Sequence, residues 1–119
     1  MSEDQEKVAE DCIQILTDRI KKNSDKIKGW GKAIRIGFMD LDIGYWIKLS
    51  MDGPVEKVEK GPWKKIKAME AVTSLITTTE VLEGSLNKTI DARSAAASGQ
   101  IKIEGSYDGL IRLSPALMG

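Results

Sequence analysis

Alternation of side-chain character over residues 43–51 is the sequence feature that most constrains the fold of this chain. Ile, Tyr, Ile, Leu and Met occupy every second position, and Gly, Trp, Lys and Ser stand between them. Successive side chains of a strand point to opposite faces, so this period of two predicts a strand with one buried face. Residues 34–38 alternate in the same way. We expect the intervening Asp40-Leu41-Asp42 to form the turn of a hairpin.

The N-terminal stretch has a helical period instead. Val8, Cys12, Leu16 and Ile20 recur at intervals of four, which places them on one face of an amphipathic helix. We expect this helix to end between residues 23 and 28, before a glycine.

Further along the chain, short alternating and helical stretches follow one another. The predicted elements are strands over 55–59, 68–76 and 100–105, and helices over 77–86, 88–98 and 106–117. The resulting order, α-β-β-β-β-α-α-β-α, predicts an α+β fold with one five-stranded, mostly antiparallel sheet covered on one face by helices. We expect the first four strands to form a meander. The fifth follows a helical crossover, which allows it to pair in parallel with an earlier strand.

Size and composition limit the functional classes. The chain has 119 residues, which fits one domain over 1–119 that buries roughly two-thirds of its unfolded surface. Eighteen acidic and eighteen basic side chains cancel, so a nucleic-acid partner is not expected. Residues 1–10 are polar and acidic, unlike a secretory signal, and no apolar run approaches the ~20 residues of a membrane span. We therefore expect a cytoplasmic protein. Oligomeric state is not indicated.

The reactive side chains are few. Histidine is absent, and Cys12 is the single cysteine, so we expect no metal, no cofactor and no disulfide. Cys12 lies on the apolar stripe of the first helix, which indicates an inert core residue. Asp40 and Asp42 could form an acid–base pair or a cation site, but a hairpin turn explains both. No cluster indicates an enzyme, and we predict no catalytic residues.

Several segments of the second half carry a family resemblance. Ala71–Leu75 resembles a strand of the pattern Ala-Asp-apolar-Thr-apolar, and Val81–Lys88 a short helix ending in a Thr-Gly-Lys-like turn. Ser98–Gly105 is similar to the motif Gly-Lys-Leu-Lys-Ile-x-Gly, and Leu110–Leu113 stands where Ala-Met-Lys-Leu is usual. These segments together resemble the sterol carrier protein type-2 family. By pattern the resemblance extends over almost the whole chain, and by motif it is strongest from residue 71 onward.

The resemblance implies an apolar tunnel between sheet and helices. Such tunnels hold fatty acids, acyl-CoA thioesters, sterols or related lipids, and the family has no agreed catalytic residues. We therefore expect non-catalytic carriage of a hydrophobic ligand. Periodicity by itself favours an ordinary core for the same side chains. The predicted wall residues are Leu16, Ile20, Ile36, Ile47, Leu75, Val81, Leu82, Leu86, Ile90, Ile101, Ile103, Leu110, Leu113 and Leu117.

An alternative follows from the same resemblance, because some family members are domains fused to enzymes. The chain could be an interaction or accessory module that keeps the fold and acts with a partner lipid enzyme. A collapsed or polar interior would favour that reading.

Three departures from the family pattern bear on the cavity. Val72 replaces the usual Asp, so any polar contact made there is lost. Ala95–Ala97 occupies positions that often carry bulky side chains. Gly109 takes the place of a large apolar residue. We expect the small residues to enlarge the cavity.

Basic residues provide candidates for contact with a lipid head group or a membrane. Lys88 and Arg112 could each bind a head group. Trp63, Lys64 and Lys65 lie in a lysine-rich stretch, where an indole and cations could contact an anionic membrane surface transiently. Alternatively, Trp63 folds over the sheet edge in a strand connection.

Overall fold

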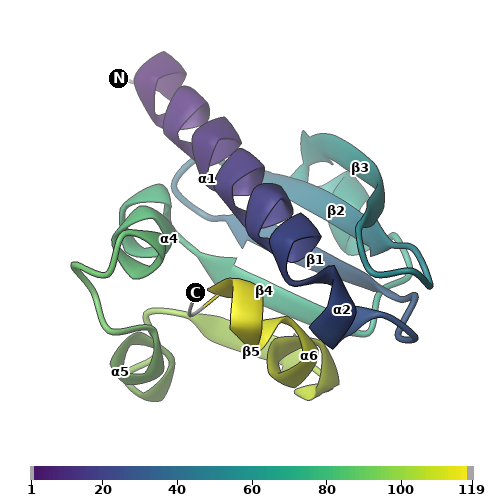
Figure 1. The fold of residues 1–119 in the computed structure, drawn as a ribbon. Coiled ribbons are helices and arrows are strands. Elements are labelled where there is room, and N and C mark those ends of the chain that lie inside the picture. The colour runs from purple at the N-terminus through teal and green to yellow at the C-terminus, as the bar shows by residue number, and fades with distance from the viewer. Residues whose placement is uncertain (1, 118–119) are drawn as a thin grey trace.

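The computed structural model describes residues 2–117, and it confirms the predicted α+β class (Figure 1). Among these residues, no helix is both long and apolar enough to cross a membrane. The elements are α1 (Ser2–Lys22), α2 (Ser24–Ile27), β1 (Ala33–Phe38), β2 (Ile43–Leu49), β3 (Val55–Pro62), α3 (Trp63–Lys67), β4 (Thr73–Thr77), α4 (Thr79–Leu86), α5 (Ala92–Ala97), β5 (Lys102–Gly105) and α6 (Asp108–Leu117).

The five strands form one sheet in the order β3-β2-β1-β4-β5. The meander contains three strands rather than four. Strand β4 does not pair with β3; it pairs in parallel with β1, along the edge of β1 that faces away from β2. The parallel pair is therefore β1 with β4, whereas β5 is antiparallel to β4. Parallel neighbours need a crossover, and residues 63–72 between β3 and β4 provide it.

This crossover also changes where the fourth strand begins. The fourth strand begins at Thr73 and not at 68, because residues 63–67 form the unpredicted helix α3. Two side chains of the sheet hold the connection in place. The Arg35 guanidinium donates to the carbonyl of Lys67, and Trp46 Nε1 donates to the carbonyl of Glu70 at 2.9 Å.

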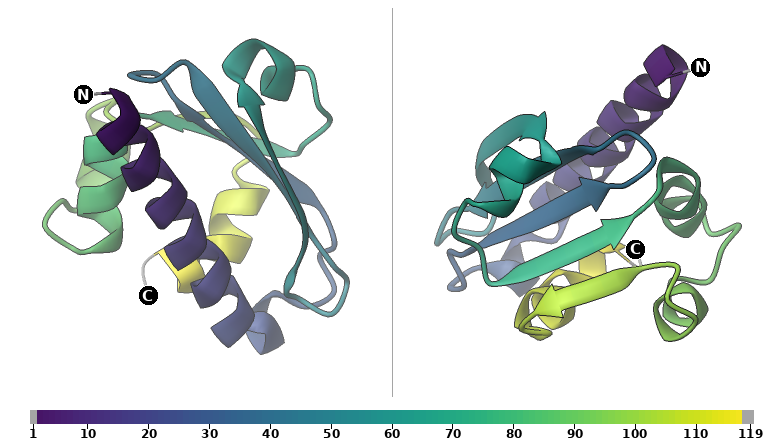
Figure 2. Two further views of the ribbon diagram at one scale, coloured as in Figure 1. Left: turned by 90° about the horizontal axis from the view of Figure 1, so that it is seen from above. Right: turned by 180° about the vertical axis from the view of Figure 1, so that it is seen from behind.

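The sheet separates two unequal layers (Figure 2). Helices α1, α4 and α6 cover one face, where the core contains Leu16 and Ile20 from α1 with Ile36 and Ile47 from the sheet. Helix α3 lies on the opposite face. Its Trp63 ring packs over a pair of glycines in β1 and β2. A Cβ on the second of these, at position 44, would lie 2.6 Å from the ring, so glycine is needed for this contact.

Close approach of α6 to β4 fixes the position of the last helix. Gly109 packs against Thr73, and its backbone N–H donates to Thr73 Oγ1 at 3.1 Å. A Cβ at 109 would lie 2.5 Å from that oxygen and 2.8 Å from Thr73 Cβ. The expectation that Gly109 enlarges a cavity is therefore wrong. This glycine instead lets the backbone of α6 pack closely against β4.

Hydrogen bonds hold α6 at both ends. Near its start, the Asp108 carboxylate accepts from Trp30 Nε1 at 3.3 Å. Near its end, the Arg19 guanidinium of α1 donates to the carbonyl of Ala116 at 3.5 Å and to that of Leu86, at the end of α4, at 2.7 Å. Carbonyls at helix ends lack intrahelical partners. Arg19 therefore supplies a donor to a C-terminal carbonyl of α4 and to one of α6, and links both helices to α1.

We predict that Gly109→Ala lowers stability, although alanine ordinarily favours a helix. The new methyl group would overlap Thr73, and overpacking of this kind costs about 1–3 kcal/mol. Thermal unfolding followed by circular dichroism measures the effect. Gly61→Ala is the matched control, because a Cβ there meets its nearest atom at 3.7 Å. An unchanged or higher melting temperature for Gly109→Ala would contradict the close approach.

Candidate functional site

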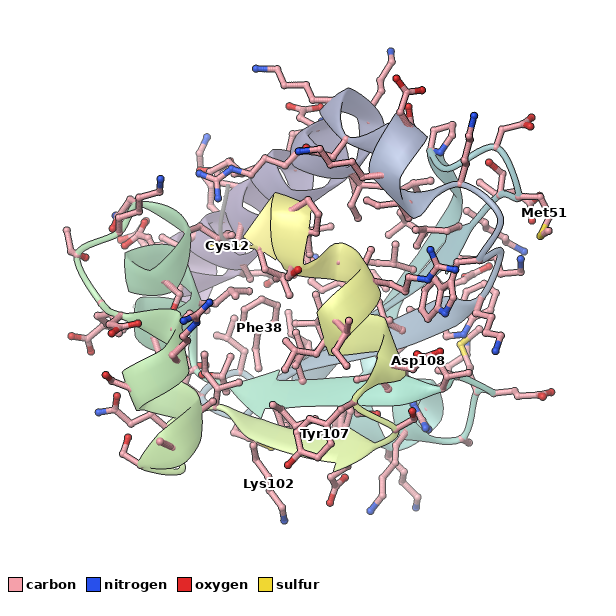
Figure 3. All side chains as sticks on the ribbon, turned by 60° about the horizontal axis from the view of Figure 1, so that its bottom comes forward. Cys12, Phe38, Met51, Lys102, Tyr107 and Asp108 are labelled. Carbon is pink, nitrogen blue, oxygen red and sulfur yellow. The ribbon has the colours of Figure 1, made fainter. Side chains whose placement is uncertain are left out.

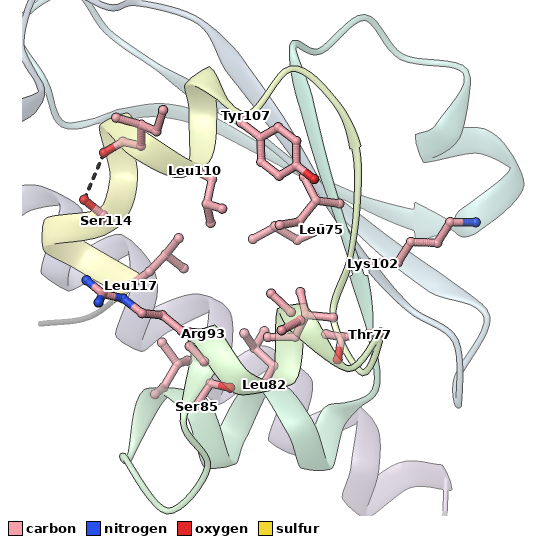
Figure 4. A pocket seen from close by; sticks show the side chains of 18 residues that line it. Leu75, Thr77, Leu82, Ser85, Arg93, Lys102, Tyr107, Leu110, Ser114 and Leu117 are labelled. Carbon is pink, nitrogen blue, oxygen red and sulfur yellow. Dashed lines mark hydrogen bonds between the residues drawn. The ribbon is translucent and has the colours of Figure 1, made fainter.

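A cavity of about 680 Å³ lies between the β4–β5 end of the sheet and helices α4, α5 and α6 (Figure 4). Its volume falls within the range of about 300–1,000 Å³ typical of small-molecule sites. The lining residues are Leu75, Thr77, Leu82, Ser85, Leu86, Ala92, Arg93, Ala96, Ala97, Gly99, Ile101, Lys102, Ile103, Tyr107, Leu110, Ile111, Ser114 and Leu117. Most of them are apolar. Exposed Tyr107 and Ile111 are among them, so the cavity opens to solvent.

Local periodicity places the walls. Leu82 and Leu86 are one turn apart on α4, and Leu110 and Leu117 are two turns apart on α6, so each pair lies on one helix face. Leu75 of β4 closes the side toward the sheet. The cavity is thus bounded by side chains from three successive parts of the second half of the chain.

Half of the predicted wall residues lie together at this cavity, namely Leu75, Leu82, Leu86, Ile101, Ile103, Leu110 and Leu117. The structure places a second group elsewhere, in the closed core: Leu16, Ile20, Ile36, Ile47 and Leu113. All five side chains are buried completely or nearly so, between α1, α6 and the sheet. The remaining two also lie outside the cavity. Val81 is half-buried at the edge of the core, and Ile90 lies beside a smaller hollow and over Gly84.

Small residues on the α5 side were only partly anticipated. Ala96 and Ala97 line the cavity, which fits the expectation that small side chains enlarge it, whereas Ala95 is buried in the core. Sequence reasoning missed Ala92 and Gly99. The signal was available, since four of the six residues of α5 are alanines, which leave space that larger side chains would fill.

The serine and threonine hydroxyls in the wall donate their protons to backbone carbonyls. Thr77 Oγ1 donates to the carbonyl of Gln100 at 2.9 Å, and Ser114 Oγ donates to the carbonyl of Ile111 at 2.9 Å. Ser85 Oγ donates to the carbonyl one turn earlier at 2.8 Å. A hydroxyl that donates to the protein can still accept a hydrogen bond. These groups therefore interrupt the apolar wall only weakly.

Two residues with cationic side chains, Arg93 and Lys102, are among those lining the cavity, but the Lys102 side chain points away from it (Figure 4). None of the described lining residues is acidic. Lys102 forms an exposed ion pair with Glu104 at 3.5 Å, which solvent screens. Arg93 extends from α5 toward Leu117 of α6 (Figure 4), and its guanidinium forms no hydrogen bond or ion pair with any side chain or backbone group of residues 4–117. Arg93 is the group best placed to meet the polar end of a ligand.

The residues predicted to contact a head group or membrane are spread over three places. Lys88, with φ of 68°, lies at the smaller hollow beside Ile90, and Arg112 is exposed on α6 outside the cavity lining. Exposed Lys64 and Lys65 and half-buried Trp63 belong to α3, behind the sheet. The Trp63 ring lies on the sheet, over its two glycines.

Of the two aspartates in the hairpin turn, Asp40 has a structural role. The Asp40 carboxylate accepts from the backbone N–H of Thr79 at 3.2 Å and from its hydroxyl at 2.5 Å, and thereby caps the start of α4. Asp42 adopts a positive φ of 53° in the turn. Among the described residues, no three histidine, cysteine, aspartate or glutamate side chains gather where they could hold a metal ion.

We predict that Cys12 is unreactive in the folded protein. Burial, with smaller contributions from the charges of Glu83 and Asp11, raises the pKa of its thiol from 9.0 to about 12. The thiolate fraction near neutrality then falls about a thousandfold, and only the thiolate is nucleophilic. Iodoacetamide should leave Cys12 unmodified until urea unfolds the chain, as mass spectrometry would show. Alkylation of the folded protein at the rate of a free thiol would contradict this burial.

Comparison with known proteins identifies the fold. No family model matches the sequence, and no curated protein matches it. Among solved structures, sterol carrier protein 2 has a TM-score of 0.64 at 10% identity, over 90% of this chain and 88% of its own. The solution structure of a palmitated sterol carrier protein 2-like protein from Aedes aegypti has a TM-score of 0.55 at 14% identity, over 90% and 95%.

A third structural relative is much longer than this chain. A double mutant of the sec-alkyl sulfatase PisA1 has a TM-score of 0.62 at 18% identity, over 81% of this chain but only 14% of the sulfatase. Many further structural neighbours are sterol carrier protein 2 domains. The chain therefore has the sterol carrier protein 2 fold, and the resemblance seen in the sequence is confirmed at that level.

Proposed function

We propose that this protein is a non-catalytic carrier that binds a hydrophobic small molecule, such as a fatty acid, acyl-CoA, sterol-like or isoprenoid lipid. The observation that carries the proposal is the open, mostly apolar cavity of about 680 Å³ between β4, β5 and helices α4 to α6. A structural neighbour described as palmitated supports the ligand class. A single lipid-binding domain over 1–119 and a cytoplasmic location are parts of the same proposal.

The energetics of such a site depend on apolar area. Transfer of each CH₂ from water contributes about 0.8 kcal/mol, so a long chain needs few directed contacts. The serine and threonine hydroxyls of the wall already donate to backbone carbonyls, so an apolar ligand would leave none of these donors without a partner. Arg93, which has no polar partner among residues 4–117, would receive a carboxylate or phosphate while the chain occupies the apolar part.

The accessory-module alternative receives less support. The alkylsulfatase shows that this fold also occurs as a small part of a longer enzyme. A module that has lost its ligand would tend to fill the interior with side chains, since empty space forfeits packing contacts. The open cavity and its small α5 residues support carriage instead.

We predict that Ala96→Trp abolishes binding of a fluorescent fatty acid, because an indole would occupy the space beside α5. Fluorescence titration measures the loss. Ala97→Trp, at a more exposed lining position, is a second test that disturbs packing less. The matched control is Ala68→Trp, since Ala68 is exposed after α3, behind the sheet. Full binding by both cavity variants would place the ligand elsewhere and contradict the proposal.

We also predict a regular dependence on chain length. Affinity for linear saturated acids should rise about fourfold for each added CH₂, the factor that corresponds to about 0.8 kcal/mol. The increase should stop once the chain fills the cavity. Displacement of the fluorescent probe by a homologous series gives these affinities. A flat series would indicate that the cavity does not hold the chain.

A further inference from the structure

The outward face of helix α6 carries two large apolar side chains. Tyr107 is 61% exposed and Ile111 is 67% exposed, whereas the opposite face of the helix is buried. The backbone N–H of Ile111 donates to the carbonyl of Tyr107 at 3.0 Å, so the two side chains are neighbours one helical turn apart. In Figure 3, α6 lies on the side toward the viewer, where no other element of the described chain covers it. Neighbouring apolar side chains on an uncovered helix face are typical of a contact surface.

Two opposite charges lie beside this apolar pair. Asp108 and Arg112 are exposed, and each follows one of the two apolar residues directly in the sequence. Opposite charges four residues apart can pair within a helix, yet Asp108 and Arg112 form no ion pair with each other. Asp108 accepts from Trp30 Nε1 at 3.3 Å through one carboxylate oxygen. The Arg112 guanidinium has no polar partner among the residues whose side chains the structure describes. A negative and a positive group therefore stand side by side along α6, open to a partner.

This face is complementary to a second copy of itself. When two α6 helices lie antiparallel about a two-fold axis, Tyr107 of each copy opposes Ile111 of the other. Asp108 of each copy then opposes Arg112 of the other, because both charged residues lie on the same flank of the helix. The two sets of contacts are compatible, since they are displaced along the helix by one residue, a rise of about 1.5 Å. A parallel pair would instead place like charges together.

We propose that the protein forms a two-fold symmetric dimer in which the outward faces of two antiparallel α6 helices pack together. Two-fold dimers are the commonest homo-oligomers, and in them one patch meets itself. The apolar pair would supply most of the affinity, and the charges on its flank would fix the antiparallel orientation. Eighteen acidic and eighteen basic side chains cancel, so no long-range repulsion between copies opposes the contact.

The dimer would also border the cavity. Tyr107 and Ile111 belong to the cavity lining as well as to the outward face of α6. A second α6 helix packed on them would therefore lie beside the opening and extend a wall that one copy leaves incomplete. The contact does not rest on the proposed lipid carriage, because its apolar and charged pairs are complete without a ligand.

The rival surface for self-association is the edge strand β3. Val58 is 41% exposed near its middle, and one side of the strand has no neighbour in the sheet. The charges of β3 are already paired, however. Lys57 pairs with Glu59 at 3.0 Å, and Lys60 pairs with two glutamates of α1 at 2.6 and 2.9 Å. Charged side chains on an edge strand disfavour pairing with another strand, so the α6 face is the better candidate.

Sedimentation equilibrium of the ligand-free protein at increasing concentration tests the dimer. We expect a reversible equilibrium between monomer and dimer. Ile111→Ser should raise the dissociation constant about tenfold or more, because both copies lose an apolar contact. Val58→Ser is the matched control, since Val58 is an exposed β-branched residue of β3, and this variant should dimerise like the unmodified protein. Circular dichroism checks that each variant is folded.

Exchange of the charges tests the antiparallel arrangement. Asp108→Lys places a cation against Arg112 of the other copy, and Arg112→Glu places an anion against Asp108. Each variant alone should therefore be mostly monomeric, because like charges oppose each other across the interface. An equimolar mixture of the two variants should form a heterodimer, since every charge then meets its opposite. A change in folding of either variant cannot produce this restoration.

Unmodified protein that stays monomeric at millimolar concentration overturns the dimer and leaves the outward face of α6 to solvent or to a different partner. Dimerisation that is lost in Val58→Ser and kept in Ile111→Ser overturns the α6 contact in favour of β3. Failure of the mixed charge variants to associate overturns the antiparallel arrangement. Titration with the fluorescent fatty acid tests lipid carriage separately, and each of these outcomes leaves it standing.

Discussion

The parallel pairing of β4 with β1 is the contact on which the rest of this structure depends. It moves the second half of the chain across the sheet, so that β4 and its neighbour β5 extend the sheet away from β2 and β3. Helix α1 packs against α4 and α6, and its apolar face closes the core over Ile36 and Ile47. The β5 end of the sheet is left to the short helices α4, α5 and α6. The cavity lies where these helices meet that end and do not fill the space between them.

An apolar cavity of this size has to be kept open by its frame, because its lining forfeits packing contacts that collapse would restore. Two features provide the frame. Gly109 sets α6 directly against Thr73, and hydrogen bonds from Trp30 and Arg19 hold the two ends of the helix. The α5 side contributes small residues that cannot reach across. A bound apolar ligand would recover the missing contacts, which relates the packing of the walls to the proposed carriage.

The polar groups within the wall of the cavity differ from the charged group at its rim. The serine and threonine hydroxyls of the wall donate to backbone carbonyls, whereas the Arg93 guanidinium, which has no polar partner among residues 4–117, stands at the rim. Apolar surface and charge are therefore separated along the direction in which an amphiphile would lie. The exposed Tyr107 and Ile111 continue the apolar surface outward. This arrangement fits the proposed carriage of an amphiphile, whose chain would be held inside.

The elements with a local pattern could be predicted from the amino-acid sequence alone. Alternation over 34–38 and 43–51 specified the hairpin, the interval of four specified α1, and the motif around 98–105 indicated β5 and the fold. Tertiary structure decided which apolar side chains face space and which face other side chains. Leu113 and Leu117 share one helix, yet the first is buried in the core and the second lines the cavity. The helical period cannot distinguish their surroundings, because both residues are leucines on the same face of α6. Their surroundings differ only through the elements that pack around each of them. The role of Gly109, the connection through α3 and the place of Arg93 at the rim likewise depend on contacts between segments far apart in the chain.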